Sequence, residues 1–357
     1  MRELFETMIE RLFADLATPA YVLGCEGGEW PAQLWAALDD SGFTLAGAPE
    51  ALGGADASWA DMYVMVRAAG RHAVPAPLGE ALLANWVLGK AGLEGREGAL
   101  SIAARAELSL ADGHVSGTAH AVPWGRNVEA LVAIATTAAG TPQVVLLQRS
   151  TASDLTLSLN VAGEPRDDLA FSAAPVLAHA PLPDGLGADV LKLGGAMLRS
   201  AQIAGALQAL LDMAAGYARE RKQFGKAIGS FQAIQQQLAV LAQQTAAARI
   251  AAEAAFCESV SGLAGLTIAV AKISSADAAS VGASIGHSVH GAIGFTEEYP
   301  LHLLSRRLWA WRSEFGSASL WSQRLGAQIC QGGSEGYWPL LTRHGIHPLT
   351  GLVSNRL

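Results

Sequence analysis

The sequence predicts an α+β fold in three successive parts: a helical N-terminal domain, a middle β-sandwich or barrel, and a C-terminal four-helix bundle. Helical periodicity covers residues 1–97. Short apolar runs separated by turn residues then fill residues 98–185. The helical period returns over residues 186–335, and a tail rich in glycine and proline, 336–357, is expected to be extended.

The N-terminal part is expected to be helical because its apolar residues recur at three- and four-residue spacing. The pattern is clearest over residues 31–43, 57–73 and 79–92, with glycine and proline marking the turns between them. Asp56 and Ser58 are candidates to cap the second of these helices, because a short oxygen-bearing side chain accepts hydrogen bonds from the first turn.

The middle part is predicted to be an antiparallel β domain. Its runs 131–136 and 143–148 are dense in β-branched residues and leucine. Gly, Asp and Asn separate such runs, which is typical of a sandwich or barrel.

The last part is predicted to be an antiparallel bundle of four long helices with apolar stripes. Alanine is abundant there, which favours helix and permits close packing. The four expected helical segments are 191–224, 230–260, 263–295 and 301–330.

Composition excludes several classes of protein. Of the 357 residues, 51% are apolar and 16% charged, which excludes a disordered chain. The net charge of −8 and the lack of a basic run argue against nucleic-acid binding. No uninterrupted apolar stretch predicts a membrane span, and the N-terminus does not resemble a signal peptide. Cys25, Cys257 and Cys330 are scattered without metal-ligand spacing, so a cytoplasmic protein with reduced cysteines is expected.

Several segments resemble the acyl-CoA dehydrogenase family. Residues 218–228 and 230–235 resemble its R-x-x-F-G…F-Q-x-x-Q signature, between the first two helices of the bundle. Residues 290–300 resemble its glycine-rich turn that ends in Tyr-Pro. Residues 47–54 and 70–77 resemble two N-terminal segments of the family. The segments follow the family order and span nearly the whole chain.

This resemblance implies an FAD held against the thioester of an acyl-coenzyme A. In the family, the two bundle turns reach the ADP half of an FAD whose flavin lies in the neighbouring subunit, so an oligomer is implied. An arginine fork suits phosphate oxygens, glutamine amides suit ribose and phosphate oxygens, and glycines let backbone N–H groups approach the dinucleotide. The candidate FAD-binding residues are Arg221, Gln223, Phe224, Gln232, Gln235, Ser288, His290, Gly291, Ala292 and Gly294.

Simpler interpretations of these residues stand beside that one. An Arg-Lys cluster between helices is usually a solvated helix end, and the run 235–237 of glutamines is typical of a helix surface. His287 and His290 are spaced like a metal pair, but without a third ligand nearby packed histidines are expected. Trp309 and Trp311 are expected in the core of the bundle.

The resemblance also implies a carboxylate base that removes the substrate α-proton while the β-hydride passes to flavin N5. Such a base needs a pKa raised toward neutrality. Most family members have this Glu where Phe315 stands here, and others have it in a helix whose counterpart, residues 194–199, lacks a carboxylate. Glu314, one position earlier, is the candidate base. The alternative is an ordinary acid, either on the surface or ion-paired with Arg307 or Arg312.

Two functions are left open. In the first, the chain performs FAD-dependent α,β-dehydrogenation of an acyl-CoA and passes electrons to an electron-transfer flavoprotein. In the second, it is a non-catalytic subunit of a heteromeric dehydrogenase that supplies Arg221, Gln223 and the Gly291 turn to a partner's FAD, as in bacterial steroid side-chain degradation. Departures from the family pattern at 122–127 and 306–307 favour the second.

Overall fold

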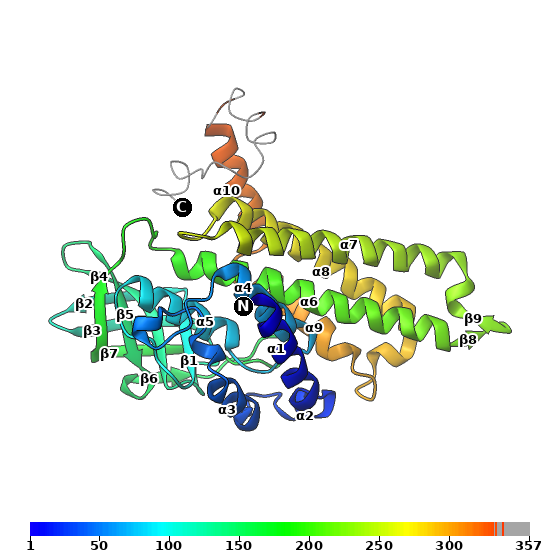
Figure 1. The fold of residues 1–357 in the computed structure, drawn as a ribbon, viewed down its shortest axis with the longest axis horizontal. Helices are drawn as coiled ribbons and strands as arrows, with labels where there is room; N and C mark the ends of the chain where they lie inside the picture. Colours follow the sequence, from blue (N-terminus) through cyan, green and yellow to red (C-terminus); the bar gives the residue numbers. More distant parts are fainter. Residues whose placement is uncertain (332, 334–337, 339–357) are drawn as a thin grey trace.

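A computed structural model describes residues 1–331, 333 and 338, and it confirms the α+β class (Figure 1). Apart from Trp338, the tail predicted at 336–357 lies outside the described residues. The barrel of β-strands lies at one end of the molecule, and a small hairpin, β8–β9, extends from the bundle at the opposite end (Figure 1). The N-terminal helices and the bundle share one continuous hydrophobic core.

Helices α1–α5 form the N-terminal part. Ser58 begins α4 with a capping box: its hydroxyl accepts from the Asp61 amide at 3.2 Å, and the Asp61 carboxylate accepts from the Ser58 amide. The predicted Ser58 cap is therefore confirmed, whereas Asp56 lies outside the helix with φ of 51°. The helices are α1 (Arg2–Leu16), α2 (Pro19–Gly24), α3 (Ala32–Asp40), α4 (Trp59–Arg71) and α5 (Leu78–Lys90), with 3-10 turns at Phe43–Leu45 and Glu50–Leu52.

The middle part is a barrel, because strands β4, β2, β3, β7 and β5 pair in a closed ring. The prediction of a purely antiparallel sheet is wrong: β4 pairs in parallel with β1 and β2. The chain reverses twice between β2 and β4, so the two strands point the same way when the ring closes. The strands are β1 (Leu100–Ala103), β2 (Ala106–Ala111), β3 (His114–Pro123), β4 (Ala130–Thr137), β5 (Pro142–Gln148), β6 (Asp154–Thr156) and β7 (Arg166–Pro181).

Strand β4 explains the apolar run seen in the sequence, because both of its faces are buried. Leu131, Ala133 and Ala135 point into the barrel core. Ala130 and Val132 alternate with them and belong to the core that the barrel shares with the helices. The barrel is thereby attached to the helical body through a second hydrophobic layer.

The bundle contains α6 (Val190–Glu220), α7 (Gln232–Glu258) and α8 (Gly265–His290). The expected fourth helix is instead two helices, α9 (Leu301–Trp311) and α10 (Ala318–Gln331). Phe315 and Gly316 break it, with φ of 54° and 109°, and such left-handed backbone cannot continue a right-handed helix. The connections contain β8 (Lys222–Gln223), β9 (Lys226–Ala227) and 3-10 turns at Ile228–Ser230 and Gly291–Phe295.

Helix α8 with its 3-10 turn, Gly265–Phe295, has the length and hydropathy of a membrane span. However, 56% of its most apolar window is buried inside the chain, where it packs on α6 and α7. A core helix of a bundle passes the same test of length and composition.

Helices α4 and α6 touch through glycines. A Cβ atom on Gly205 would lie 1.9 Å from the Arg67 carbonyl oxygen, and one on Gly70 would lie 2.0 Å from the Gln202 carbonyl oxygen. The backbones therefore approach more closely than any side chain allows, which joins the N-terminal part firmly to the bundle.

Gly205→Ala is expected to lower the free energy of unfolding by about 1–3 kcal/mol, because the added methyl forces two backbones apart. Gly216→Ala is the matched control on the same helix, since a Cβ there meets nothing within 4 Å. That control should instead stabilise the chain by up to about 1 kcal/mol through helix propensity. Urea unfolding measures both, and equal effects of the two variants would contradict the close contact.

Candidate functional site

The β8–β9 hairpin presents most of the first predicted FAD motif to solvent (Figure 1). Its two central residues, Phe224 and Gly225, have φ of 53° and 80°, as in the tight turns of two-residue hairpins. Phe224 is consequently 90% exposed at the tip. Arg221 leaves α6 in an extended conformation and is exposed, as is Gln223. Such a turn displays a cation, an amide and an aromatic ring together.

The hairpin carries an excess of unpaired positive charge. Among the described residues, Arg221, Lys222 and Lys226 form no salt bridge. Lys226 lies 4.4 Å from the ring centroid of Phe231, and Phe224 packs edge-on against the same ring. Guanidinium and ammonium groups without a salt bridge, beside the exposed ring of Phe224, suit an anionic ligand that also has a flat ring.

The second predicted motif lies at the same end of the bundle, where α8 ends. Gly291 ends the helix with φ of 62°, a conformation that disfavours other residues. The rings of Tyr217 and His290 lie 4.7 Å apart, and those of His290 and Tyr299 4.9 Å apart. This aromatic stack fixes the end of α6 against the Gly291 turn, so two motifs distant in sequence become neighbours.

His290 itself faces inward. It is 4% exposed, its Nδ1 lies 2.7 Å from the Gly286 carbonyl oxygen, and burial lowers the pKa of its imidazole. The side chain therefore positions the turn, while the exposed residues after it, Gly291 and Ala292, are the ones open to a ligand. No three His, Cys, Asp or Glu side chains among the described residues are grouped so that they could hold a metal ion.

Glutamines connect the turns at this end of the bundle, and Gln232 and Gln235 among them are predicted FAD residues. Gln235 donates to the Gly229 carbonyl oxygen at 3.0 Å and closes the turn before α7. Gln237 donates to the Ser288 hydroxyl at 3.0 Å and ties α7 to α8. Gln232 begins α7 and is exposed. The structure thus brings all ten predicted FAD residues to one end, and the exposed cations there fit the pyrophosphate of FAD.

Glu314, the candidate base, lies elsewhere, in the break between α9 and α10. Arg166 of β7 binds it through two nitrogens, at 2.9 and 3.0 Å. Arg199 of α6 donates to it at 2.7 Å and Asn160 at 2.9 Å. Neither Arg307 nor Arg312, the partners considered from the sequence, pairs with it. The sequence did not indicate Arg166 and Arg199 as partners, because they lie far from Glu314 along the chain, in two other parts of the fold.

These contacts extend into a buried network of three carboxylates and three guanidinium groups. Arg199 also pairs with Glu80 at 2.6 Å. Glu164 accepts from Arg166 at 2.9 Å and lies 3.3 Å from Arg307. Their opposite charges balance, which buried ions require. The interdomain ion network, as we call it, contains Glu80, Glu164, Arg166, Arg199, Arg307 and Glu314.

The network stabilises the charged form of Glu314. Burial opposes its charge, but Arg166 and Arg199 outweigh burial and hold the pKa of this carboxyl well below its usual range. Nearby, Lys272 donates to the carbonyl oxygens of Trp311 and Arg312 at 3.1 and 2.7 Å, which fixes the end of α9. Burial lowers the pKa of Lys272 to about 7.

Phe315 fills the space beside Glu314. A Cβ on Gly195 would lie 2.4 Å from the Phe315 ring, and the Arg199 guanidinium lies 5.2 Å from the centre of that ring. Trp311 is buried as expected and donates to Glu164 at 3.0 Å. The expectation for Trp309 is wrong: it is 41% exposed and lies 4.2 Å from the Arg312 guanidinium, because it falls on the outer face of α9.

The two sites are far apart. Arg199 lies within α6 and Arg221 caps its C-terminal end, 22 residues later in the chain. At 1.5 Å per residue, a helix of that length spans roughly 33 Å. Along this helix the hairpin is therefore about 33 Å from Arg199 and the Glu314 that it binds.

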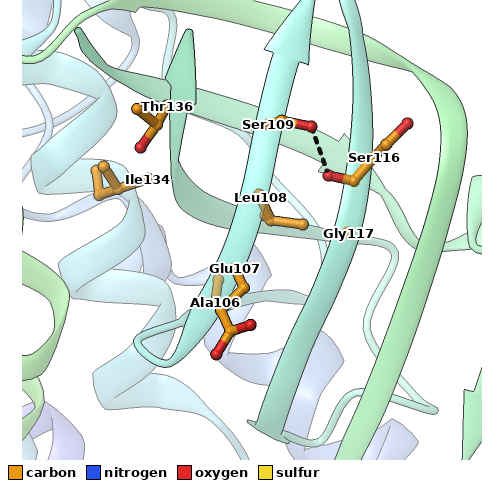
Figure 2. Close-up of a pocket in the computed structure, with 8 residues that line it drawn as sticks. All are labelled: Ala106, Glu107, Leu108, Ser109, Ser116, Gly117, Ile134 and Thr136. Atoms are coloured by element: carbon orange, nitrogen blue, oxygen red, sulfur yellow. Dashed lines mark hydrogen bonds between the residues drawn. The ribbon is translucent and has the colours of Figure 1, made fainter. Parts of the chain in front are cut away.

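A cavity of about 470 Å³ on the outside of the barrel is unrelated to either site (Figure 2). It lies over β2, β3 and β4, and Ser109 donates to the Ser116 carbonyl oxygen beside it (Figure 2). Its lining contains one charged group, Glu107, and no cation, so it offers nothing to an anionic cofactor.

Comparisons with known proteins agree with this architecture. Residues 193–320 match the family model of the acyl-CoA dehydrogenase C-terminal domain. The chain is 30% identical to acyl-CoA dehydrogenase IpdE2 of Mycobacterium tuberculosis, over 86% of this chain and 90% of the relative. It is 30% identical to FadE34 of the same organism, of which it spans about half, 47%, while 91% of this chain is covered.

Solved structures show the same fold. A variant of the Tcur3481-Tcur3483 steroid ACAD superposes with a TM-score of 0.82 at 25% identity, covering 93% of this chain and 98% of that chain. The ChsE4-ChsE5 complex from Mycobacterium tuberculosis gives 0.83 at 22% identity, over 92% and 97%. With these relatives and the geometry above, the chain belongs to the acyl-CoA dehydrogenase family, a family of oxidoreductases.

Proposed function

We propose that this chain is a subunit of a heteromeric, FAD-dependent acyl-CoA dehydrogenase. Its β8–β9 hairpin and Gly291 turn complete the FAD site of a partner subunit, and the partner supplies the base. The observation that carries this proposal is the pairing of Glu314 with Arg166 and Arg199. The assembly acts on an acyl-CoA and passes electrons to an electron-transfer flavoprotein in the cytoplasm, as the family resemblance implies.

The state of Glu314 argues against a base in this chain. A general base works best when its pKa lies near the operating pH. For Glu314 this would require a raised pKa, but Arg166 and Arg199 lower it. Taking up a proton would leave Arg166 and Arg199 short of a counter-charge in a buried place. Phe315, in the family position of the base, has no group that accepts a proton.

The position of the hairpin argues for a role in another subunit's site. Its cations and the Phe224 ring point away from the chain's own core. Along α6 the hairpin lies about 33 Å from Arg199 of the interdomain ion network. A ligand bound by Arg221 is therefore best supplied by a second subunit that docks at this end. Two of the similar solved structures, Tcur3481-Tcur3483 and the ChsE4-ChsE5 complex, are each named for two proteins, which supports a heteromer.

A second candidate function keeps Glu314 as the base of an independent dehydrogenase. The observation in its favour is the place of Glu314, one residue from the family position and 17% exposed. This function requires Glu314 to leave both arginines when substrate binds. The two candidates differ in what happens when this carboxylate is removed.

Anaerobic flavin reduction by a panel of acyl-CoAs separates them. Glu314→Gln, in the complete assembly and normalised to its flavin content, is expected to bleach flavin at the parent rate. Loss of a general base would slow bleaching by about 10²–10⁴-fold. Glu107→Gln, an exposed acid on the barrel, controls for the lost charge. Severe slowing specific to Glu314→Gln, or bleaching by the parent chain purified alone, would contradict the proposal.

A further inference from the structure

A cationic cavity lies between helices α4, α6 and α7, away from both sites described above. Its volume is about 340 Å³, within the range of small-molecule sites. Helices α4 and α7 meet at one end of it, where the Tyr63 hydroxyl donates to the Arg249 carbonyl oxygen at 3.3 Å. Its lining places three arginines beside a small apolar patch that includes Leu211.

Two guanidinium groups of the cavity, those of Arg67 and Arg71, have N–H donors without a hydrogen-bond acceptor. Arg67 donates to Glu6 at 2.6 Å, yet its Nε is buried without a partner. Arg71 approaches Glu10 at 3.6 Å and Asp212 at 3.8 Å, both beyond hydrogen-bonding distance. A guanidinium has five N–H donors in a fixed plane, so most of those offered here are unused.

Arg249 contributes a third guanidinium group to the cavity. It is exposed on α7 and forms no salt bridge within the described part of the chain. The cavity lining contains one carboxylate, Asp212, which accepts from Gln208 at 2.9 Å. The other nearby acids, Glu6 and Glu10, belong to α1 and face Arg67 from outside the lining. Three guanidinium groups of the lining therefore face one carboxylate, while Glu6 and Glu10 offset part of their charge from α1.

We propose that this cavity binds a small oxyanion, a phosphate or a carboxylate, through Arg67, Arg71 and Arg249. Guanidinium forks bind the paired oxygens of both groups in the same planar manner. The apolar patch beside them accommodates a short carbon chain on the ligand. Because the arginines come from α4 and α7, the bound anion also clamps the N-terminal part to the bundle.

Calorimetric titration of the full chain with sodium phosphate and with sodium succinate tests the site, at ionic strength matched with sodium chloride. Saturable binding of at least one anion is expected. Arg249→Gln and Arg71→Gln should each weaken it at least tenfold, the usual effect of losing a charge-assisted hydrogen bond. Both residues are partly or fully exposed, so the variants can be compared with the parent by their melting temperatures.

Arg105→Gln is the matched control, because it removes the same charge from an exposed position on the barrel. It should leave the affinity unchanged. Preference for phosphate or for succinate identifies the ligand class. Absence of saturable binding by the parent, or equal affinities of the parent and both cavity variants, would overturn the site. The result does not depend on whether the chain completes a partner's FAD site.

Discussion

Arg199→Met is expected to lower the free energy of unfolding by about 3–5 kcal/mol, the usual cost of leaving a buried ion without its partner. Arg199 is 2% exposed and joins Glu80 of α5 to Glu314 of the α9–α10 break. Without it, Glu80 loses its salt bridge and Glu314 retains only Arg166. Methionine is shorter but replaces the unbranched apolar stem of the arginine, so the loss of charge should outweigh the loss of volume.

Arg219→Met is the matched control for this experiment. It removes an arginine from the same helix, but Arg219 is exposed and has no salt bridge within the described residues. Its effect should stay within about 0.5 kcal/mol. Chemical unfolding of both variants gives the comparison. If both variants lowered the free energy of unfolding equally, the interdomain ion network would contribute nothing to holding the three parts together.

Glu80→Gln combined with Arg199→Met refines this result. The two residues are in direct contact, so their effects should not be additive. Removing Glu80 as well takes away the carboxylate that Arg199→Met leaves unpaired. The double variant is therefore expected to be less destabilised than the sum of the single variants.

Arg221→Ala is expected to weaken FAD binding by the complete assembly by about 1.5–3 kcal/mol, the contribution of a hydrogen bond to a charged group. That change corresponds to roughly 10–150-fold in dissociation constant. The folding stability of the chain should change little, because Arg221 is exposed and unpaired. Flavin fluorescence after equilibrium dialysis measures the retained FAD.

Two further variants test the geometry of this contact. Arg221→Lys keeps the charge but loses the planar fork, so it should recover only part of the affinity. Arg219→Ala, two positions away, removes a neighbouring exposed charge and should have a smaller effect than Arg221→Ala. FAD retention by Arg221→Ala equal to that of the parent would exclude a phosphate contact at this residue.

The parts of the fold that depend on local pattern were predictable from the sequence. The Ser58 cap followed from residues adjacent in the chain. The apolar run of β4 indicated a strand, and the alanine-rich segments indicated long helices. The break at Phe315 was missed, because helical periodicity continues across it and the left-handed backbone is stabilised by contacts with α6.

The candidate sites divide in the same way. The hairpin motif was visible because Arg221, Phe224 and Gly225 lie within one turn, where spacing alone determines proximity. Arg199 gave a weaker signal, because it is the one charged residue in the stretch 193–207, which is otherwise mostly apolar or small. Its partners come from α5 and from the α9–α10 break, and long-range ion pairs leave no periodicity in the sequence.

The sequence by itself thus determined the order of the three parts, the family resemblance and the residues of the β8–β9 hairpin that are predicted to contact FAD. Only the tertiary structure decided the environment of Glu314. The reason is electrostatic: the proton affinity of a carboxyl depends on burial and on the charges within a few ångströms. For Glu314 these are Arg166 and Arg199, which lie 148 and 115 residues away along the chain.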